Sequence, residues 1–236
     1  MSQEPIIYDD GDMVENASLA IEAALREALN TRGTASLIVS GGSSPKPLYA
    51  QLSKADLDWS NISISLVDER WVDRGEAGSN EDFIRDNLVQ NNASSAKFFG
   101  LKTAHPSVEL GLNDAEARFE AIEQPFDVCV MGMGGDAHTA SWFPNAKGLS
   151  NALSLENENI LCGIDAAGAP VAGDHPHRIS LTLNAVLNSH LIILFIPGEA
   201  KREVFDSVSS KSLFDAPVQA LLQAGQKLHV FASPKS

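Results

Sequence analysis

The chain has 236 residues and carries 17 basic against 31 acidic side chains, which gives a formal net charge of −14 at pH 7. A surface of this charge repels nucleic-acid phosphates and anionic lipids, so we expect neither a nucleic-acid nor a membrane partner. The composition, 44% hydrophobic and 20% charged residues, is that of a globular protein, and the length fits a single α/β domain over residues 1–236.

The sequence carries no pattern of export or membrane insertion. The N-terminal Met-Ser-Gln-Glu-Pro lacks the basic start and apolar stretch of a signal peptide, and the apolar run 191–197 is too short to span a bilayer. Cys129 and Cys162 each lie in an apolar run, which predicts buried free thiols in a reducing compartment. We therefore expect a cytoplasmic protein, either a monomer or a homodimer.

Helical and strand patterns alternate along the chain. Apolar residues at helical spacing predict a first helix over 12–33, with Gly33 at its C-terminal cap. In chain order, the following segments are predicted as strand 34–42, helix 43–53, strand 61–69, helices 79–90 and 109–124, strands 126–132, 159–164, 177–182 and 190–198, helix 199–208 and strand 227–233. This alternation indicates a doubly wound, Rossmann-like α/β fold, a mostly parallel sheet with helices on both faces.

In such folds ligands bind beyond the carboxyl ends of the strands. The first of these ends is followed by Gly41, Gly42, Ser43 and Ser44. Glycines let a ligand approach the backbone closely, and free N–H groups where a helix begins bind anions. The segment matches neither G-x-G-x-x-G nor a Walker P-loop, so it implies no nucleotide. A glycine turn followed by a serine N-cap is the alternative interpretation.

The second strand end carries Asp68, Glu69 and Arg70. In the functional interpretation, Asp68 accepts a hydrogen bond from a sugar hydroxyl and Arg70 faces an anion. In the alternative, the two carboxylates and the arginine pair with one another at the surface.

The third strand end, after 126–132, runs through a glycine-rich turn into Asp136 and His138. Histidine is the side chain most often used as a general base at neutral pH. Asp136 either orients the imidazole or binds a sugar hydroxyl. The alternative interpretation of His138 is a structural or merely solvated side chain.

Two cations lie near later strand ends and complete the candidate set. Arg178 begins the strand 177–182, and Lys201 follows the strand 190–198, so both are candidate anion ligands in a strongly acidic chain. No histidines occur in an H-x-x-x-H or H-E-x-x-H arrangement, so we expect no metal. No G-x-S-x-G elbow occurs, which disfavours a serine hydrolase.

Taken together and in order, the segments "SGGSSP", "LVDERWV…SN…R", "MGMGGDAHTASWFP", "PHRISLTLNAVLNS" and "FIPGEAKREVF" resemble the 6-phosphogluconolactonases of the glucosamine-6-phosphate isomerase/deaminase fold family. The resemblance covers about residues 35–205. It implies hydrolysis of 6-phospho-D-glucono-1,5-lactone in the oxidative pentose phosphate pathway, with a histidine general base, His138, and with no metal or organic cofactor. The residues that it assigns to the phosphate and the sugar are Gly41, Gly42, Ser43, Ser44, Asp68, Glu69, Arg70, Arg178 and Lys201.

Two other functions fit the same fold. Sugar-phosphate isomerases and deaminases resemble this chain, but they carry an acidic residue soon after the histidine, in a pattern like F-N-E-P. Here Phe143-Pro144-Asn145 follows, and the first acidic residue after His138 is Glu156. A non-catalytic sugar-phosphate sensor in a transcription regulator would need a basic DNA-binding segment, for which no residues are left over.

Ala137 departs from the family pattern, which has glycine between the aspartate and the histidine. If this position needs a positive φ, alanine adds strain of roughly 1–2 kcal/mol. Either φ is negative here or the loop is strained, and in both cases we expect His138 to keep its place beside the anion site.

Overall fold

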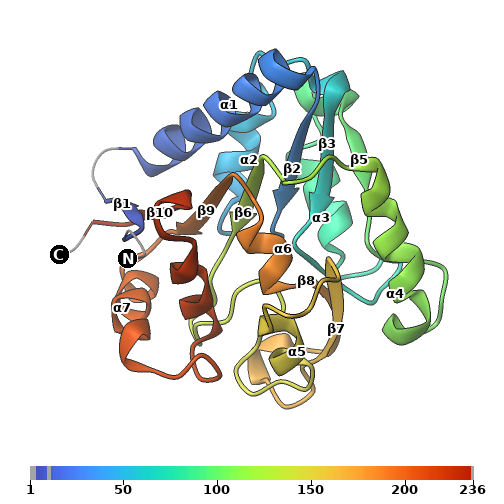
Figure 1. Ribbon diagram of the computed structural model, residues 1–236, viewed down its shortest axis with the longest axis vertical. Helices are drawn as coiled ribbons and strands as arrows, with labels where there is room; N and C mark the ends of the chain where they lie inside the picture. Colours follow the sequence, from blue (N-terminus) through green and yellow to red (C-terminus); the bar gives the residue numbers. More distant parts are fainter. Residues whose placement is uncertain (1–3, 10–11, 235–236) are drawn as a thin grey trace.

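The computed structural model describes residues 4–9 and 12–234, and these form a seven-stranded sheet with strand order β1-β10-β9-β6-β2-β3-β5 (Figure 1). Each neighbouring pair in this sheet is parallel. The strands are β1 (Ile6–Tyr8), β2 (Ala35–Val39), β3 (Ile62–Leu66), β5 (Lys97–Phe99), β6 (Val128–Met131), β9 (Leu191–Ile196) and β10 (Leu228–Ala232). A parallel sheet flanked by helices confirms the predicted α/β fold class.

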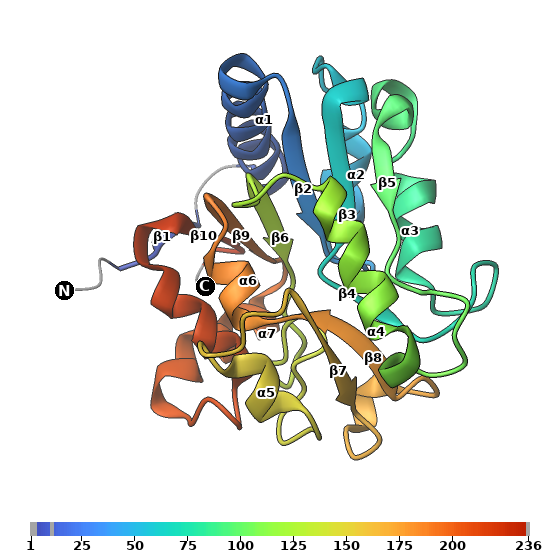
Figure 2. The same ribbon diagram turned by 45° about the vertical axis from the view of Figure 1, so that its right-hand side comes forward.

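Helices pack against both faces of this sheet (Figure 2). The α-helices are α1 (Met13–Arg32), α2 (Lys46–Leu52), α3 (Asn80–Asn87), α4 (Val108–Ala117), α5 (Leu149–Leu153), α6 (Leu183–Leu187) and α7 (Glu199–Ser207). The 3-10 helices are η1 (Trp59–Asn61), η2 (Asn91–Ser95), η3 (Arg118–Ala121), η4 (Pro170–Ala172), η5 (Val208–Ser210) and η6 (Pro217–Lys227). α1 agrees with the prediction over 12–33, because it ends at Gly33 with φ +79°.

A second, three-stranded sheet consists of β4 (Asp68–Arg70), β8 (His177–Leu181) and β7 (Leu161–Asp165), in that order. Both pairs are antiparallel. The prediction that segments 159–164 and 177–182 belong to the parallel sheet is therefore wrong. The connection between them holds only a 3-10 turn, and strands joined without a crossover helix pair antiparallel.

Val67 joins the two sheets. Its N–H donates to the carbonyl of Val39 at the end of β2 (3.0 Å), and its own carbonyl accepts the N–H of Leu181 at the end of β8 (2.8 Å). The chain thus passes from β3 directly into β4, and the second sheet lies beside the carboxyl ends of the parallel strands (Figure 2). The segment 61–69, predicted as one strand, is divided here between two sheets.

The parallel sheet forms the core, and β2 and β6 are buried at every position. Cys129 and Cys162 are buried free thiols, as predicted. The strands β1 and β5 were not predicted, because three residues are too few to show a pattern. Within the described residues, no helix is long and apolar enough to cross a membrane.

Candidate active site

A cavity of about 270 Å³ lies where β2, β3 and β6 end, beside the second sheet. Most of the residues that the sequence singled out meet here. Those that line the cavity are Gly41, Gly42, Ser43, Ser44, Asp68, Arg70, His138, Arg178 and Lys201. Glu69 and Asp136 are not part of the lining, whereas Asn80 and Phe143, which the sequence analysis did not choose as site residues, are.

The glycine-rich segment 41–44 forms one wall of the cavity. Gly42 has φ +89°, a conformation that favours glycine. The serine N-cap of the alternative interpretation is not observed: helix α2 begins after Pro45, and no side chain caps it. The Ser44 hydroxyl instead accepts a hydrogen bond from the Lys201 ammonium group at 2.9 Å. This pair joins two segments that lie 157 residues apart.

Asp68 also lines the cavity, although its residue is only 6% exposed. The hydroxyl of Ser141 donates to one carboxylate oxygen at 2.6 Å, and the side-chain amide of Asn80 donates to the other at 3.3 Å. These contacts fix the carboxylate in one orientation. A carboxylate held in this way can accept hydrogen bonds from ligand hydroxyl groups.

Three cations face the same cavity. Arg70 and Arg178 are direct cross-strand partners in β4 and β8, an arrangement in which like charges repel. Burial lowers the pKa of Arg178 to about 10, and burial also lowers the pKa of Lys201. Among the residues that the structure describes, none of the three cations forms an ion pair. A bound anion would relieve this repulsion, so the cavity is built for an anionic ligand.

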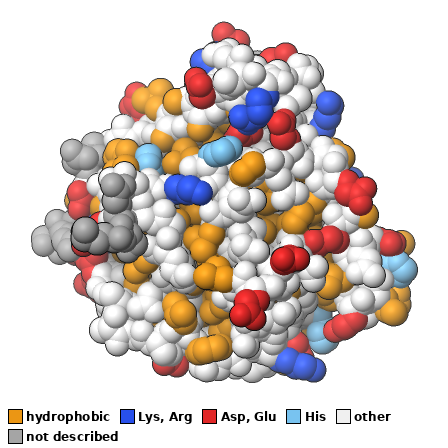
Figure 3. Space-filling view, in the orientation of Figure 1, with side chains coloured by type: hydrophobic (Ala, Val, Ile, Leu, Met, Phe, Trp, Pro, Cys, Tyr) orange, Lys and Arg blue, Asp and Glu red, His pale blue; other side chains and the backbone are white. Residues whose placement is uncertain are grey.

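The three cations of the cavity differ from the scattered charges on one face of the molecule (Figure 3). On the face shown in Figure 3, acidic side chains are scattered widely, and the described Lys and Arg side chains form no broad patch. The cavity, by comparison, is lined by Arg70, Arg178 and Lys201, and a concave site with three cations suits a small anion better than an extended polyanion.

His138 and Asp136 form a close pair at the end of β6. The imidazole Nδ1 atom lies 2.5 Å from the Asp136 carboxylate, which also accepts the backbone N–H of His138 at 3.3 Å. Burial alone would raise the pKa of Asp136, but the hydrogen bonds and charge of His138 outweigh burial and lower it. An Nδ1 proton shared with Asp136 leaves Nε2 free to accept a proton.

Phe143 contacts both His138 and Arg178. Its ring centroid is 4.4 Å from that of the His138 imidazole, and the Arg178 guanidinium carbon lies 5.4 Å from the same centroid. One buried aromatic ring thus sets the spacing between the imidazole and a cation.

The loop that carries His138 is strained. Ala137 has φ +66° and is completely buried, so of the two alternatives the strained loop is the one observed. Hydrogen bonds from Ala137 N–H to the Gly134 carbonyl (3.1 Å) and from Val218 N–H to the Ala137 carbonyl (3.0 Å) hold this conformation. His138 lines the same cavity as the segment 41–44.

Residues 8–230 match the model of the glucosamine-6-phosphate isomerases/6-phosphogluconolactonase family. The chain belongs to this family. It is 36% identical over 216 residues to a 6-phosphogluconolactonase of Rhizobium meliloti, with 91% of each protein covered. It is 37% identical to one of Neisseria meningitidis, with 90% of each covered.

Solved structures of the family agree with this fold. A 6-phosphogluconolactonase of Shewanella baltica is 36% identical and superposes with a TM-score of 0.87, over 99% of this chain and 98% of that one. A monomeric glucosamine-6-phosphate deaminase, at 17% identity and a TM-score of 0.74 over 97% of each chain, shares the fold. Both branches of the family therefore use this architecture.

Three side chains that line the cavity or contact its lining were not predicted as site residues from the sequence: Asn80, Ser141 and Phe143. All three lie inside or beside the segments that carried the resemblance. Their contacts with Asp68, His138 and Arg178 form only in the folded chain, and no local sequence pattern predicts these contacts.

Proposed function

We propose that this family member hydrolyses 6-phospho-D-glucono-1,5-lactone to 6-phospho-D-gluconate, the lactonase step of the oxidative pentose phosphate pathway, in the cytoplasm. The observation that carries the proposal is the position of His138, which is paired with Asp136 and lines one small cavity together with three cations that form no ion pair within the described part of the chain. The named relatives, which are lactonases at 36–37% identity, support the same substrate.

In the proposed mechanism, the phosphate of the lactone binds to Lys201, Ser44 and the segment 41–44, with Arg178 nearby. Anchoring a remote group orients the reacting carbon and lowers the entropic part of the barrier. Asp68 accepts a hydrogen bond from a sugar hydroxyl.

His138 then acts as the general base. Its Nε2 atom removes a proton from water as the water oxygen attacks C1, and Asp136 stabilises the imidazolium that forms. The tetrahedral intermediate then collapses: the bond between C1 and the ring oxygen breaks, and the imidazolium of His138 gives its proton to the ring oxygen and becomes neutral again. The product is the open-chain carboxylic acid, which releases its proton to the solvent and leaves as the carboxylate.

The isomerase or deaminase reaction is the second candidate. Within the described lining of the cavity, Asp68 is the one carboxylate, and Ser141 and Asn80 already bind it. Ring-opening and proton shuttling on an amino sugar need a further acid close to the substrate. This favours lactone hydrolysis.

Stopped-flow measurement of acid release from freshly prepared 6-phosphogluconolactone tests the proposal, with glucosamine 6-phosphate as the control substrate. We expect turnover of the lactone alone. We expect His138→Ala to lower kcat by about 10²–10⁴-fold while binding of 6-phosphogluconate is retained. Unchanged turnover in His138→Ala would refute the general-base role, and ammonia release from glucosamine 6-phosphate would favour the rival reaction.

A further inference from the structure

The three side chains of strand β4 point to opposite faces of the strand. Asp68 and Arg70 line the cavity, whereas Glu69 between them is 1% exposed and does not line it. Successive side chains of a strand point to opposite faces, so Glu69 projects away from the cavity. The expectation that Glu69 lines the sugar site has no support in this geometry. A buried carboxylate needs partners inside the protein, and Glu69 has them.

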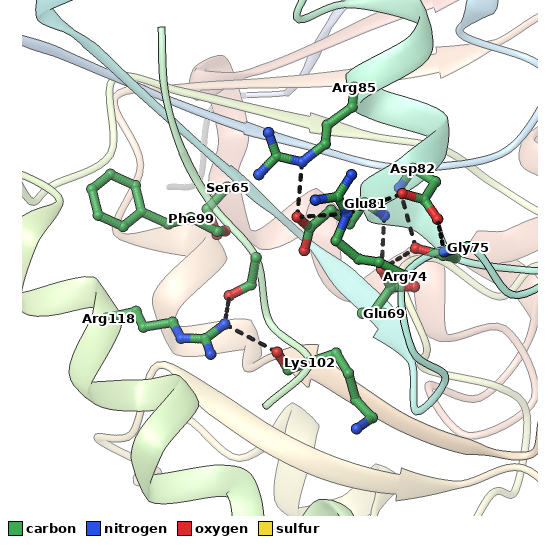
Figure 4. Close-up of polar contacts among 12 residues, drawn as sticks. Ser65, Glu69, Arg74, Gly75, Glu81, Asp82, Arg85, Phe99, Lys102 and Arg118 are labelled. Atoms are coloured by element: carbon green, nitrogen blue, oxygen red, sulfur yellow. Dashed lines mark hydrogen bonds and ion pairs between the residues drawn. The ribbon is translucent and has the colours of Figure 1, made fainter. Parts of the chain in front are cut away.

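The carboxylate of Glu69 lies at the beginning of helix α3 (Figure 4). One oxygen accepts the backbone N–H groups of Arg70 (2.8 Å) and Asn80 (2.7 Å), and the other accepts the backbone N–H of Glu81 (2.7 Å). The first N–H groups of a helix lack partners within the helix, and its dipole favours a negative charge there. Glu69 thus joins β4 to the first turn of α3.

Asn80 extends this junction into the cavity. Its side-chain amide donates to the Asp68 carbonyl at 2.9 Å and to the Asp68 carboxylate at 3.3 Å. It also lies directly against Gly41, where any side chain would overlap the Asn80 amide. Asn80, whose backbone N–H binds Glu69, therefore contacts both Asp68 and Gly41 in the cavity lining.

Two further carboxylates in the first turn of α3, those of Glu81 and Asp82, form contacts of their own (Figure 4). Glu81 forms ion pairs with Arg85 (2.8 Å) and Arg74 (3.5 Å), and Asp82 accepts the backbone N–H of Gly75 at 2.5 Å. The contacts with Arg74 and Gly75 hold α3 against the preceding loop, whereas the pair with Arg85 lies within the helix. The Glu69 contacts add the link between this turn and the strand that carries Asp68 and Arg70.

We propose that Glu69 is a positioning residue, which fixes Asp68, Arg70 and Asn80 in the sugar-binding wall without touching the substrate. This inference rests on the proposed lactonase function. The phosphate-binding side of the cavity is formed by the segment 41–44 and Lys201, none of which bonds to Glu69, and its link to the Glu69 junction is the contact of Asn80 with Gly41. Loss of the Glu69 contacts should therefore impair recognition of the sugar more than recognition of phosphate.

Glu69→Gln tests the inference in the full-length protein. Glutamine keeps the size of the side chain but turns N–H donors toward backbone N–H groups that need an acceptor. We expect kcat/KM for the lactone to fall at least tenfold, mainly through KM. The inhibition constant of inorganic phosphate, measured against the lactone, should stay within twofold of the wild-type value.

Glu116→Gln is the matched control. Glu116 also uses its carboxylate to bind two backbone N–H groups, those of Ile160 (2.5 Å) and Leu161 (2.8 Å), but it does not line the active-site cavity. The Glu116→Gln variant should have a lower free energy of unfolding than the wild-type protein, while its kcat and KM stay within twofold of the wild-type values. If Glu69→Gln does not fold, Ser79→Ala weakens the same junction more gently, because Ser79 caps α3 at the N–H of Asp82 (3.1 Å). For that variant we expect a two- to fivefold rise in KM.

Two results would overturn the inference while the lactonase function stands. In one, kcat/KM of Glu69→Gln, or of Ser79→Ala if only that variant folds, stays within twofold of wild type. In the other, the phosphate inhibition constant rises in step with KM, which indicates a general loosening of the cavity. If the wild-type protein does not hydrolyse the lactone at all, the proposed function itself is wrong.

Discussion

Gly134 lies so close to His138 that any side chain at residue 134 would overlap the Cε1 and Nδ1 atoms of the imidazole. The same side chain would also crowd the Asp136 carboxylate, at 2.7 Å from its Oδ1 atom. The absence of a side chain at this position is therefore what allows the imidazole to reach its aspartate.

Gly134→Ala should accordingly displace the imidazole. We expect kcat to fall by about 10²-fold, the usual effect of a displacement of about 1 Å in a reacting group. Gly135→Ala is the control, because a methyl group at Gly135 meets nothing within 4 Å and Gly135 does not have a positive φ. Steady-state kinetics of both variants measure the difference, and equal activities would contradict the assigned role of Gly134.

Phe143→Leu should disturb His138 and Arg178 together, because the lost ring contacts both. We expect a loss of about 1–2 kcal/mol in the free energy of unfolding and a fall of about tenfold in kcat/KM. Phe126→Leu is the control, since Phe126 is equally buried but packs against Phe119. It should be destabilised to a similar extent and keep its kcat/KM. A similar loss of activity in both variants would argue against a special role for Phe143.

Lys201→Gln should weaken phosphate recognition specifically. A hydrogen bond to a charged group is worth about 1.5–3 kcal/mol, so KM for the phosphorylated lactone should rise about 10- to 100-fold. Hydrolysis of the unphosphorylated lactone, measured at the same pH, should change less than twofold. Equal effects on both substrates would place Lys201 outside the phosphate site.

Ala137→Gly should remove the backbone strain at φ +66°, which amounts to roughly 1–2 kcal/mol. The greater freedom of glycine in the unfolded chain and the loss of a buried methyl group oppose this gain. We therefore expect a free energy of unfolding within about 1 kcal/mol of wild type and unchanged activity. Ala137→Val places a β-branched residue at a positive φ and should cost about 2 kcal/mol or more. Urea denaturation distinguishes the two variants, and a stable Ala137→Val would contradict the strained backbone.

Glu69 should make the stability of the protein depend on pH. Burial raises the pKa of its carboxyl group from 4.5 to about 7, although the N–H groups of Asn80, Glu81 and Arg70 favour the ionised form. The folded state thus holds the proton more tightly than the unfolded state. The stability that comes from this proton is fully present below pH 4.5 and is lost as the pH rises through 7.

Relative to Glu69→Gln, the wild-type free energy of unfolding should therefore fall by about 2–3 kcal/mol between pH 5 and pH 8. Urea denaturation of both proteins at the two pH values measures this difference. A constant difference would show that the Glu69 carboxyl group titrates alike in the folded and unfolded states.

Local patterns in the sequence were enough to predict the fold class and most of the cavity. Continuous apolar runs such as 190–198 mark buried parallel strands, and residues that follow such strands meet at one edge of the sheet. This rule predicts from the sequence that the segment 41–44, Asp68 and His138 lie at one site. It works because the direction of parallel strands and the position of their ends follow from short-range periodicity.

The tertiary structure alone decided how these residues are held. β7 and β8 pair with each other in a second, antiparallel sheet because a short connection joins them. Glu69 binds the backbone at the beginning of helix α3 and does not line the cavity. Asp68 is oriented by Ser141, which lies 73 residues away in the chain. Such contacts depend on register and on the packing of distant segments, whereas a sequence pattern reports only the immediate neighbourhood of each residue.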